Sequence, residues 1–332
     1  PEILPSASAA EAEEAFYYKH RDELLEVLKG GTGKSWGEVY ARLEPRDKDG
    51  VGILNQGATC YMNSLLQVLF HTPEFRLALY GFNHDPSQHG EESRCIPLQL
   101  QRLFAEMQLA NVSAVSTTGL ITACGMSDHT GEQHDVQEMC RVLFDALSRS
   151  STPLRHEIER LYAGKTVQYI RSAESFDGKV YESSRKETIL DLQLPIMGCK
   201  TLEEAMQKLV EPEELNGDNQ WFCEDLGRKV DALKGLEFES LPVILHLQLL
   251  RFVFDLVTMK RKKLTDNLSI PLELDLQHLL GPDSGPAKYE LSGMCIQMGQ
   301  AGGGHYIAKV RDRTSGQWLD ANDKTVKRLT DD

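Results

Sequence analysis

Apolar side chains recur at helical spacing through the first half of the chain. Three stretches carry this pattern, at 60–70, 97–110 and 134–147. In the third stretch, five apolar residues share one face: Val136, Met139, Cys140, Leu143 and Leu147. Pro73 ends the first stretch, because proline cannot continue a helix without losing a hydrogen bond. We therefore expect residues from 60 to about 165 to be mostly helical.

Residues 1–50 precede this region as a separate extension. Phe16, Leu24 and Leu28 recur near helical spacing among charged residues, so the extension is expected to contain an amphipathic helix that ends at Gly30-Gly31. The segment Gly30–Ser35 resembles a phosphate-binding loop. However, Leu28 occupies the place of the first required glycine and no strand precedes it, which argues against a nucleotide site.

Strand patterns dominate from about residue 166 onward. Short apolar or alternating stretches predict strands at 166–170, 189–194, 243–254, 289–297 and 306–310, with one helix at 202–209. The most apolar run, 241–257, contains several polar residues, so it is not a membrane helix; it predicts a long buried strand. Because helices come first and strands later, the predicted fold class is α+β.

The net charge disfavours certain partners, and the cysteine content indicates the cellular compartment. The net charge is −14, from 36 basic and 50 acidic residues, which disfavours nucleic acid and anionic membranes as partners. The acidity either favours basic partners or only aids solubility. The seven cysteines contain no Cys-x-x-Cys pair and fit a reducing compartment, so we expect a cytoplasmic or nuclear protein. No heptad pattern is present, and we expect a monomer.

Cys60 has the surroundings of a nucleophile. It stands at a predicted helix start, where unpaired backbone N–H groups stabilise a thiolate. Asn55 lies five residues earlier, with Gly57 between them, and its amide would hydrogen-bond the oxyanion formed when the thiolate attacks a carbonyl. For a lone cysteine, the alternative of a small buried apolar residue would be favoured.

His305 supplies a possible partner for this thiol. It follows Gly302–Gly304 and begins a predicted strand, while 318–322 is predicted to return as a second strand of a hairpin. A polar side chain on the returning strand, Asn322, would then hold the imidazole. The register is open by about two residues, so Asp320 and Asp323 remain alternatives. A flexible glycine turn with a surface histidine is the simpler interpretation.

Four separated segments together resemble the ubiquitin-specific protease family. They are 52–67, 132–138, 247–252 and 303–306, in the family's order, and the resemblance covers residues 51–332. It implies a papain-like fold with a helical thumb (about 51–165), β fingers (166–240) and a β palm (241–332). Segments 222–224 and 231–236 indicate one branch of this family.

The resemblance also implies roles for individual residues. Cys60 would be the nucleophile, His305 the general base, Asn322 its orienting partner and Asn55 an oxyanion donor. The residues implied in ubiquitin binding are Asp135, Gln133, Phe252, Gly303, Gly304 and Tyr306. Asp135 also stands at a predicted helix start, where it would serve as a cap.

The chain departs from the family pattern at two places. Many members hold zinc in the fingers with two Cys-x-x-Cys pairs, but the corresponding positions here are Ser172, Ser175, Cys223 and Leu226. Because three thiolates are missing, we expect no zinc and no other cofactor. Ala321 stands where the family usually has an aromatic residue, which affects the packing behind Asn322.

The expected function is hydrolysis of the bond at the C-terminal glycine of ubiquitin, with ubiquitin and ubiquitinated proteins as partners. Two alternatives remain open at this stage. One is a catalytically idle or dead ubiquitin-binding module, and the other is a protease for another ubiquitin-like modifier.

Overall fold

The structure is a computed structural model that describes residues 50–109, 112–126, 135–255, 259–281, 285, 287–300, 303–313 and 315–329. Residues 1–49 of the predicted helical extension at 1–50 lie outside the described residues, as do Gln133 and Gly302. The chain divides into two compact units, Pro1–Ile158 with Ser292–Asp332, and Glu159–Leu291.

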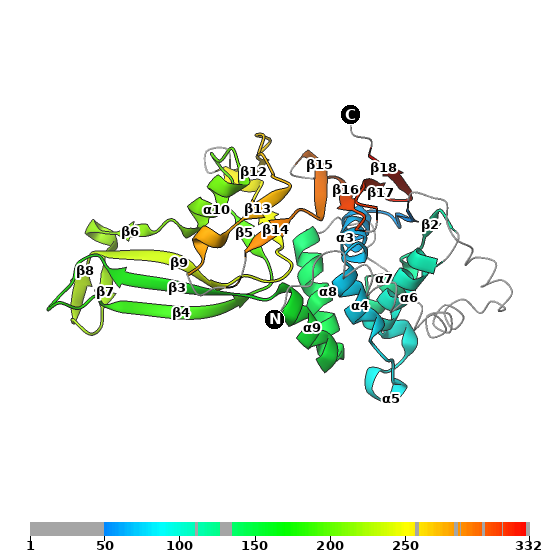
Figure 1. Ribbon diagram of the computed structural model, residues 1–332, viewed down its shortest axis with the longest axis horizontal. Coiled ribbons are helices and arrows are strands. Elements are labelled where there is room, and N and C mark those ends of the chain that lie inside the picture. Colours follow the sequence, from blue (N-terminus) through cyan, green and yellow to red (C-terminus); the bar gives the residue numbers. More distant parts are fainter. Residues whose placement is uncertain are drawn as a thin grey trace. The chain divides into compact units, whose positions relative to one another are not determined.

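The first unit contains most of the helices (Figure 1). They are α3 (Cys60–Phe70), α4 (Pro73–Tyr80), α5 (Pro86–His89), the 3-10 turn η1 (Glu92–Arg94), α6 (Ile96–Leu109), α7 (Thr118–Ala123) and α8 (Val136–Ser150). The helix α9 (Thr152–Tyr162) crosses from the first unit into the second. The helix predicted at 60–70 has these bounds in the structure, and the other two predicted helices differ by one to three residues at their ends. None of the described helices is long and apolar enough to cross a membrane.

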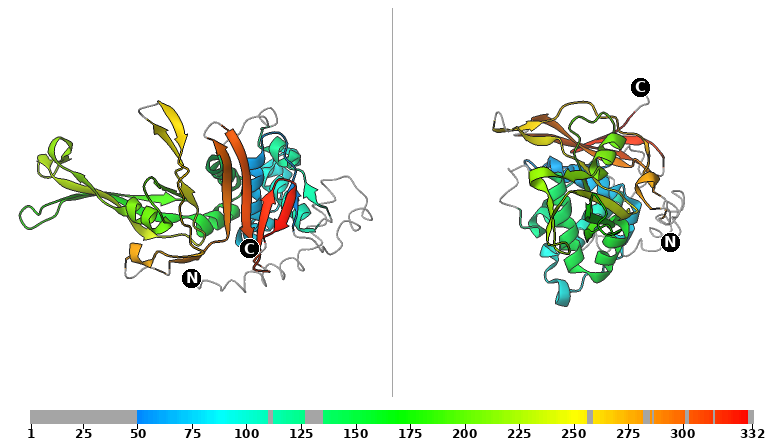
Figure 2. Two further views of the ribbon diagram at one scale, coloured as in Figure 1. Left: turned by 90° about the horizontal axis from the view of Figure 1, so that it is seen from above. Right: turned by 90° about the vertical axis from the view of Figure 1, so that its left-hand side faces the viewer.

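The C-terminal strands of the first unit form one antiparallel sheet in sequence order, orange to red in Figure 2. Its strands are β15 (Gly293–Gln300), β16 (Gly303–Arg311), β17 (Trp318–Asn322) and β18 (Thr325–Arg328). A short parallel pair, β1 (Gly52–Ile53) and β2 (Ala114–Val115), lies elsewhere in this unit.

Helix α3 packs on one face of this sheet. Val68 of α3 contacts a small buried cluster made of Ala308, Val310, Leu319 and Ala321, joined by Val326. Small and β-branched side chains let the helix approach the sheet closely. This packing holds α3 against β16 and β17.

The second unit is mainly β. Its largest sheet is four-stranded and antiparallel, in the order β4-β3-β9-β6. Those strands are β3 (Gly164–Ser172), β4 (Glu182–Ile189), β6 (Glu213–Leu215) and β9 (Ala232–Ser240). The remaining elements are β5 (Leu192–Leu194), α10 (Leu202–Val210), η3 (Gly217–Asn219), β7 (Trp221–Cys223), β8 (Arg228–Val230), β10 (Leu247–Leu249), β11 (Phe252–Asp255), β12 (Lys260–Lys263), β13 (Glu273–Asp275), η4 (Gln277–Leu279) and β14 (Lys288–Glu290).

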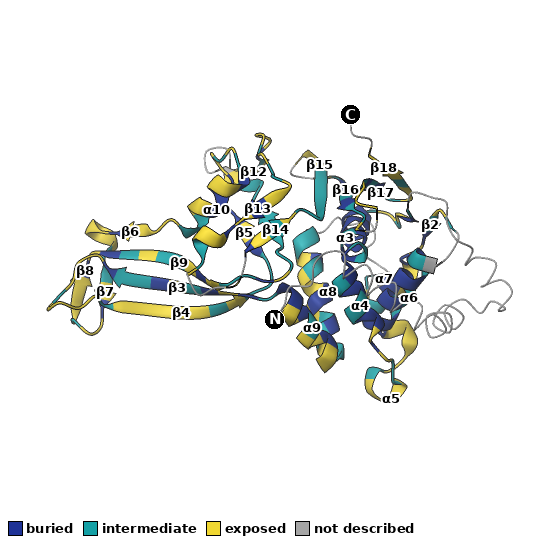
Figure 3. Cartoon of the chain, viewed as in Figure 1, coloured by how far each residue is buried: buried dark blue, intermediate teal, exposed yellow. Residues whose placement is uncertain are grey.

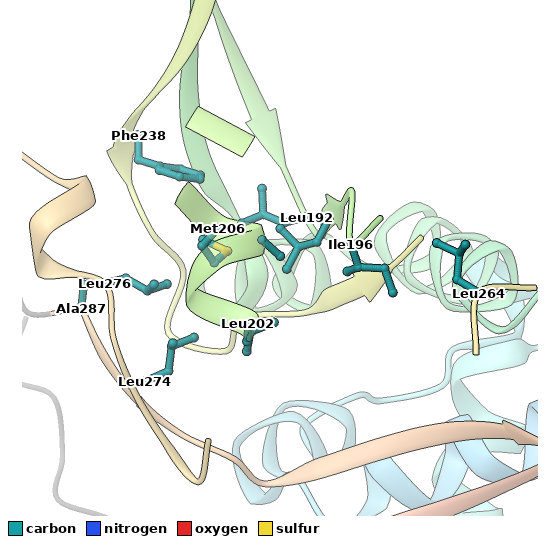
Figure 4. Packing of buried hydrophobic residues seen from close by; sticks show 11 residues of the cluster. Leu192, Ile196, Leu202, Met206, Phe238, Leu264, Leu274, Leu276 and Ala287 are labelled. Atoms are coloured by element: carbon teal, nitrogen blue, oxygen red, sulfur yellow. The ribbon is translucent and has the colours of Figure 1, made fainter. Parts of the chain in front are cut away.

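A separate hydrophobic core stabilises the second unit (Figure 4). Helix α10 contributes Leu202 and Met206, which meet Leu192 of β5, Phe238 of β9 and Leu276. Beyond this core, β4 is mostly exposed along its length (Figure 3), so it depends on pairing with β3.

The long buried strand predicted for 241–257 is wrong. The chain forms two short strands in two different sheets: β10 pairs in parallel with β5, and β11 pairs antiparallel with β12. Between them the amide of Arg251 donates to the carbonyl of Leu249 at 2.7 Å, which turns the chain. Phe254 at the far end is 54% exposed. A continuous apolar run does not distinguish one long strand from two short ones.

Candidate active site

Cys60 is the first residue of α3 and follows a tight loop built around Asn55. The side-chain carbonyl of Asn55 accepts hydrogen bonds from the amides of Gly57 (3.1 Å) and Thr59 (3.2 Å). Gly57 has φ +125°, a conformation that glycine adopts without strain. The loop therefore closes on Asn55 and delivers the chain into the helix at Cys60.

The strand before this loop is held against both α3 and the β17–β18 turn. Gln67 of α3 donates to the carbonyl of Val51 at 2.7 Å, and the amide of Ile53 donates to the carbonyl of Asp323 at 2.8 Å. At Gly52 an added Cβ would collide with the backbone of Lys324. Glycine at this position lets the β1 segment pass close to the turn.

His305 and Asn322 are brought together by the hairpin of β16 and β17. The Nε2 atom of His305 lies 2.7 Å from the Oδ1 atom of Asn322. Because a carbonyl oxygen accepts, Nε2 carries the proton and Nδ1 holds the lone pair of a neutral ring. The strands pair Ala308 with Ala321. This register is shifted by two residues from the register in which His305 would lie directly opposite Asn322. The side chains still meet, as diagonal neighbours on one face.

The thiol of Cys60 lies beside the residue that follows His305. The backbone amide of Tyr306 donates to the sulfur at 3.5 Å, although the two residues are 246 positions apart in sequence. Cys60 is buried, with 3% of its surface exposed. The helix start and the strand that carries the imidazole therefore meet within the first unit.

Asp323 connects the elements around this site. Its carboxylate accepts from the side-chain amides of Asn55 (2.9 Å) and Asn63 (2.8 Å), and it lies 4.0 Å from Nε2 of His305. Sequence reasoning named Asp323 only as an alternative orienter and missed Asn63. A signal existed: Asn63 interrupts the apolar residues of a predicted buried helix, and buried amides need partners.

The two described glycines before His305 have different surroundings. A Cβ at Gly304 would collide with the Met298 carbonyl and the Gln297 side chain on β15. Glycine is thus required there by the pairing of β15 with β16. At Gly303 an added Cβ would meet no atom within 4 Å, so that face of the backbone is open.

Asp135 is the N-cap of α8. Its carboxylate accepts from the amides of Gln137 (2.8 Å) and Glu138 (3.4 Å). Burial raises the pKa of Tyr306 to about 12, and the nearby acidic groups of Asp135, Cys295 and Cys60 add to this shift. Asp135 therefore lies within electrostatic range of Tyr306. Phe252 belongs to β11 in the second unit.

Two of the positions where the sequence departs from the family pattern, Ser172 and Ala321, have clear local partners. The hydroxyl of Ser172 donates to the Glu174 carbonyl at 2.7 Å and accepts from the Tyr181 amide at 3.0 Å. No group of three or more metal-ligating residues gathers within the part of the chain that the structure describes. The absence of zinc stays a prediction. Ala321 is buried in the cluster under α3, where its small size fits.

Comparison with known proteins identifies the family. The chain belongs to the ubiquitin carboxyl-terminal hydrolase family, whose model matches residues 51–332. The fold is therefore papain-like and of the α+β class, as the sequence predicted. The family match confirms the resemblance drawn from the four sequence segments. The relatives of this chain include ubiquitin carboxyl-terminal hydrolase 47.

Three relatives show the extent of the similarity. Ubiquitin carboxyl-terminal hydrolase 47 of Xenopus tropicalis is 37% identical over 87% of this chain and 26% of its own length. The protein of that name from Homo sapiens is 34% identical over 99% of this chain and 29% of its own. Ubiquitin carboxyl-terminal hydrolase 15 of Saccharomyces cerevisiae is 34% identical over 92% of this chain and 25% of its own. The chain thus spans about a quarter of the length of these relatives.

Proposed function

We propose that this chain is a thiol-dependent deubiquitinase that cleaves the peptide or isopeptide bond at the C-terminal glycine of ubiquitin. One observation carries the proposal. His305 Nε2 lies 2.7 Å from Asn322 Oδ1, while the amide of the next residue, Tyr306, contacts the sulfur of Cys60. A thiol, an imidazole and an orienting amide in one place form the machinery for acyl transfer through a thioester.

In the first half of the reaction, His305 takes the proton of the Cys60 thiol, and the thiolate attacks the glycine carbonyl. Asn322 holds Nε2–H, so that Nδ1 is the atom that accepts the proton. The carbon–nitrogen bond then breaks, and the protonated imidazole gives its proton to the departing lysine amine. A thioester between ubiquitin and Cys60 remains.

In the second half, water attacks the thioester while His305 takes a proton from it. The carbon–sulfur bond breaks, and the proton held by His305 returns to the sulfur. This leaves the thiol and the carboxylic acid of ubiquitin, which ionises by releasing its proton to the solvent. Asn55 serves as an oxyanion donor in both halves. Its Nδ2 carries two hydrogens. One is donated to the Asp323 carboxylate at 2.9 Å, which leaves the other for a developing oxyanion.

Substrate binding involves ubiquitin and the proteins conjugated to it. Asp135 interacts with the basic tail of ubiquitin, and Gln133, Phe252 and Tyr306 contribute further contacts. The open face of Gly303 supports a path for the tail's glycine backbone beside Gly304. In this arrangement 51–165 is the thumb, 166–240 the fingers and 241–332 the palm.

The cellular setting follows the same proposal. No disulfide joins the seven cysteines, all of which the structure describes, and this supports a reducing compartment, the cytoplasm or the nucleus. We propose a monomer without zinc, nucleic acid or membrane as partners.

A ubiquitin derivative with a C-terminal electrophile tests the proposal directly. The expected result is a covalent adduct at Cys60, located by peptide mass spectrometry, together with release of a fluorophore from a ubiquitin C-terminal amide. Cys60→Ala should abolish both signals, whereas Cys95→Ala, a buried cysteine in the loop before α6, should leave them unchanged.

Other outcomes identify the alternatives. Binding of ubiquitin without an adduct would indicate a binding module, and a faster reaction with a probe made from another ubiquitin-like protein would indicate that modifier as the substrate. Turnover that survives in Cys60→Ala would refute the assignment of the nucleophile.

A further inference from the structure

The loop that carries Asn55, here called the Asn55 loop (residues 55–59), is tied by a side chain to a distant segment of the first unit. Gln56 donates from its Nε2 atom to the hydroxyl of Ser116 at 3.1 Å, although the two residues are 60 positions apart in sequence. Ser116 directly follows β2, which pairs with β1 just before the loop. The side chain of Gln56 therefore extends the connection between these two segments past the end of the strand pairing.

The hydroxyl of Ser116 is itself fixed by the start of α7. It accepts from the backbone amide of Thr118 at 3.3 Å, and it lies 2.8 Å from the hydroxyl of Thr118. Because the two lone pairs of Ser116 Oγ are then used by Gln56 and this amide, its own hydrogen is donated to Thr118 Oγ1. The acceptor that Gln56 meets thus has one defined orientation.

Within the loop, Gln56 also contacts the hydroxyl of Thr59. The backbone amide of Gln56 donates to Thr59 Oγ1 at 2.9 Å, and this hydroxyl donates to Oδ1 of Asn55 at 3.3 Å. Thr59 is buried, so these hydrogen bonds are made away from bulk water, where an unpaired polar group is costly. The hydroxyl of Thr59 therefore joins Gln56 to the side chain of Asn55.

The orientation of the Asn55 amide follows from these donors. Its Oδ1 accepts from the backbone amides of Gly57 and Thr59, and the Thr59 hydroxyl is a third donor. Donors on this side require the oxygen there, which places Nδ2 on the other side, where it donates to Asp323. A turn of the amide by 180° would set its N–H groups against three other donors. The direction of the proposed oxyanion donor thus depends on the contacts of Oδ1.

We propose that Thr59 and Ser116 are positioning residues for Asn55, the proposed oxyanion donor. Thr59 fixes the direction of the Asn55 amide, and Ser116 fixes the place of the loop through Gln56. This inference rests on the proposed thiol-dependent hydrolysis and adds to it two residues that act through Asn55 rather than on the substrate. Their effect falls on the transition state, in which the oxyanion forms, and not on the binding of ubiquitin.

Steady-state hydrolysis of a fluorogenic ubiquitin C-terminal amide by the complete 332-residue chain tests this proposal. A group that acts only on the transition state changes kcat and leaves KM unchanged. Thr59→Val should lower kcat about thirtyfold, less than the loss of an oxyanion donor itself, because it removes both hydrogen bonds of the hydroxyl. Ser116→Ala should lower kcat about fivefold, because one hydrogen bond to the loop is lost.

Conservative variants and a matched control accompany these changes. Thr59→Ser and Ser116→Thr keep the hydroxyls and should keep kcat within about twofold of the unmodified chain. Ser113→Ala removes another exposed hydroxyl, three residues before Ser116, and keeps the backbone carbonyl that accepts from the Gly52 amide at 2.9 Å. It should also stay within about twofold. A purely structural role would lower Tm in Ser116→Ala without this fall in kcat.

Coupling to Asn55 separates positioning from a general loss of structure. If both hydroxyls act through this amide, adding Thr59→Val or Ser116→Ala to Asn55→Ala should lower kcat by less than about twofold further. Full multiplication of the single effects would overturn the proposal. A rise in KM at constant kcat would also overturn it, as would equal losses of kcat in Ser113→Ala and Ser116→Ala.

Hydrogen exchange supplies a readout that needs no ubiquitin. The backbone amide of Thr59 donates to Asn55, so Ser116→Ala should speed its exchange about fivefold, whereas Ser113→Ala should not change it. An active chain in which Ser116→Ala altered neither exchange nor kcat would refute this inference alone. A chain that exchanged as expected but hydrolysed no ubiquitin amide would refute the proposed function, and with it the catalytic purpose of the two hydroxyls.

Discussion

Replacing Asp323 with asparagine removes one negative charge from the centre of the site while keeping the shape of the side chain. Asp323 has φ +48°, a left-handed conformation that asparagine also tolerates, so the backbone of the turn should persist. The carboxylate accepts from Asn55 and Asn63 and lies 4.0 Å from Nε2 of His305. An asparagine amide would turn a donor towards one of these partners, which leaves that hydrogen bond unmade.

The expected magnitude follows from these contacts. Two opposite charges 4.0 Å apart interact by about 1 kcal/mol in water and about 4 kcal/mol at the effective dielectric of a protein surface. The side chain of His305 is 36% exposed, which favours a value near 2 kcal/mol for the imidazolium formed during catalysis. This corresponds to a fall of about thirtyfold in kcat/KM. Displacement of Asn55, the proposed oxyanion donor, would add to this loss.

The assay is hydrolysis of a fluorogenic ubiquitin C-terminal amide, with circular dichroism to confirm folding. Asp320→Asn is the matched control, because it makes the same isosteric change three residues earlier, on β17 and opposite Lys309. It should keep kcat/KM within about twofold of the unmodified chain. If Asp323→Asn stayed within threefold, or if Asp320→Asn lost as much activity, the reasoning about Asp323 would be refuted.

Three further predictions concern other parts of the chain. Gly304→Ala should lower both Tm and activity, because the added methyl group collides with β15. Gly303→Ala should leave Tm unchanged and raise KM, because its added methyl group meets no atom. Equal losses of Tm for the two variants in thermal unfolding would contradict this prediction. Asp135→Ala should lose about 1 kcal/mol of stability, because the helix loses its N-cap. Asp135→Asn should keep the cap and still raise the KM for ubiquitin. An unchanged KM in Asp135→Asn would refute the proposed contact with the ubiquitin tail. Burial lowers the pKa of His246 from 6.5 to about 4. As the pH falls from 6.5 to about 4, the unfolded chain therefore binds a proton that the folded chain does not. The free energy of unfolding decreases over this range by at most about 3 kcal/mol, and by less because the ring is partly exposed. His246→Gln should flatten this slope in urea unfolding at a series of pH values, and parallel slopes would contradict the interpretation.

The helical half of the chain was predictable because each helix carries its own signals. The helix at Cys60–Phe70 has an apolar stripe and a proline soon after its end, so its bounds follow from local sequence. The cap at Asp135 follows for the same reason. The strands were less predictable. The prediction missed β4 and β9. Both strands pair with β3, a contact that no local pattern reveals, and β4 is also mostly exposed.

The residues of the candidate site were named from sequence, but their contacts were not. Spacing predicted that Asn322 would lie near His305, yet the register differs by two residues and the side chains meet diagonally. The link between Asn55, Asn63 and Asp323 joins residues more than 250 positions apart. It exists because Gly52 lets one backbone pass close to another, a steric fact that appears only when both segments are in place.

For this protein, the order of amino acids alone determined the main helices of the first half, the family and the identities of the groups able to do chemistry. These depend on interactions within a few residues, or on motifs that can be recognised directly in the sequence. The folded chain alone decided which atoms touch: the thiol beside the Tyr306 amide, and the carboxylate of Asp323 between two side-chain amides. Such contacts depend on strand register and on packing across long stretches of chain, where the free-energy differences among alternatives are small and shared by many residues.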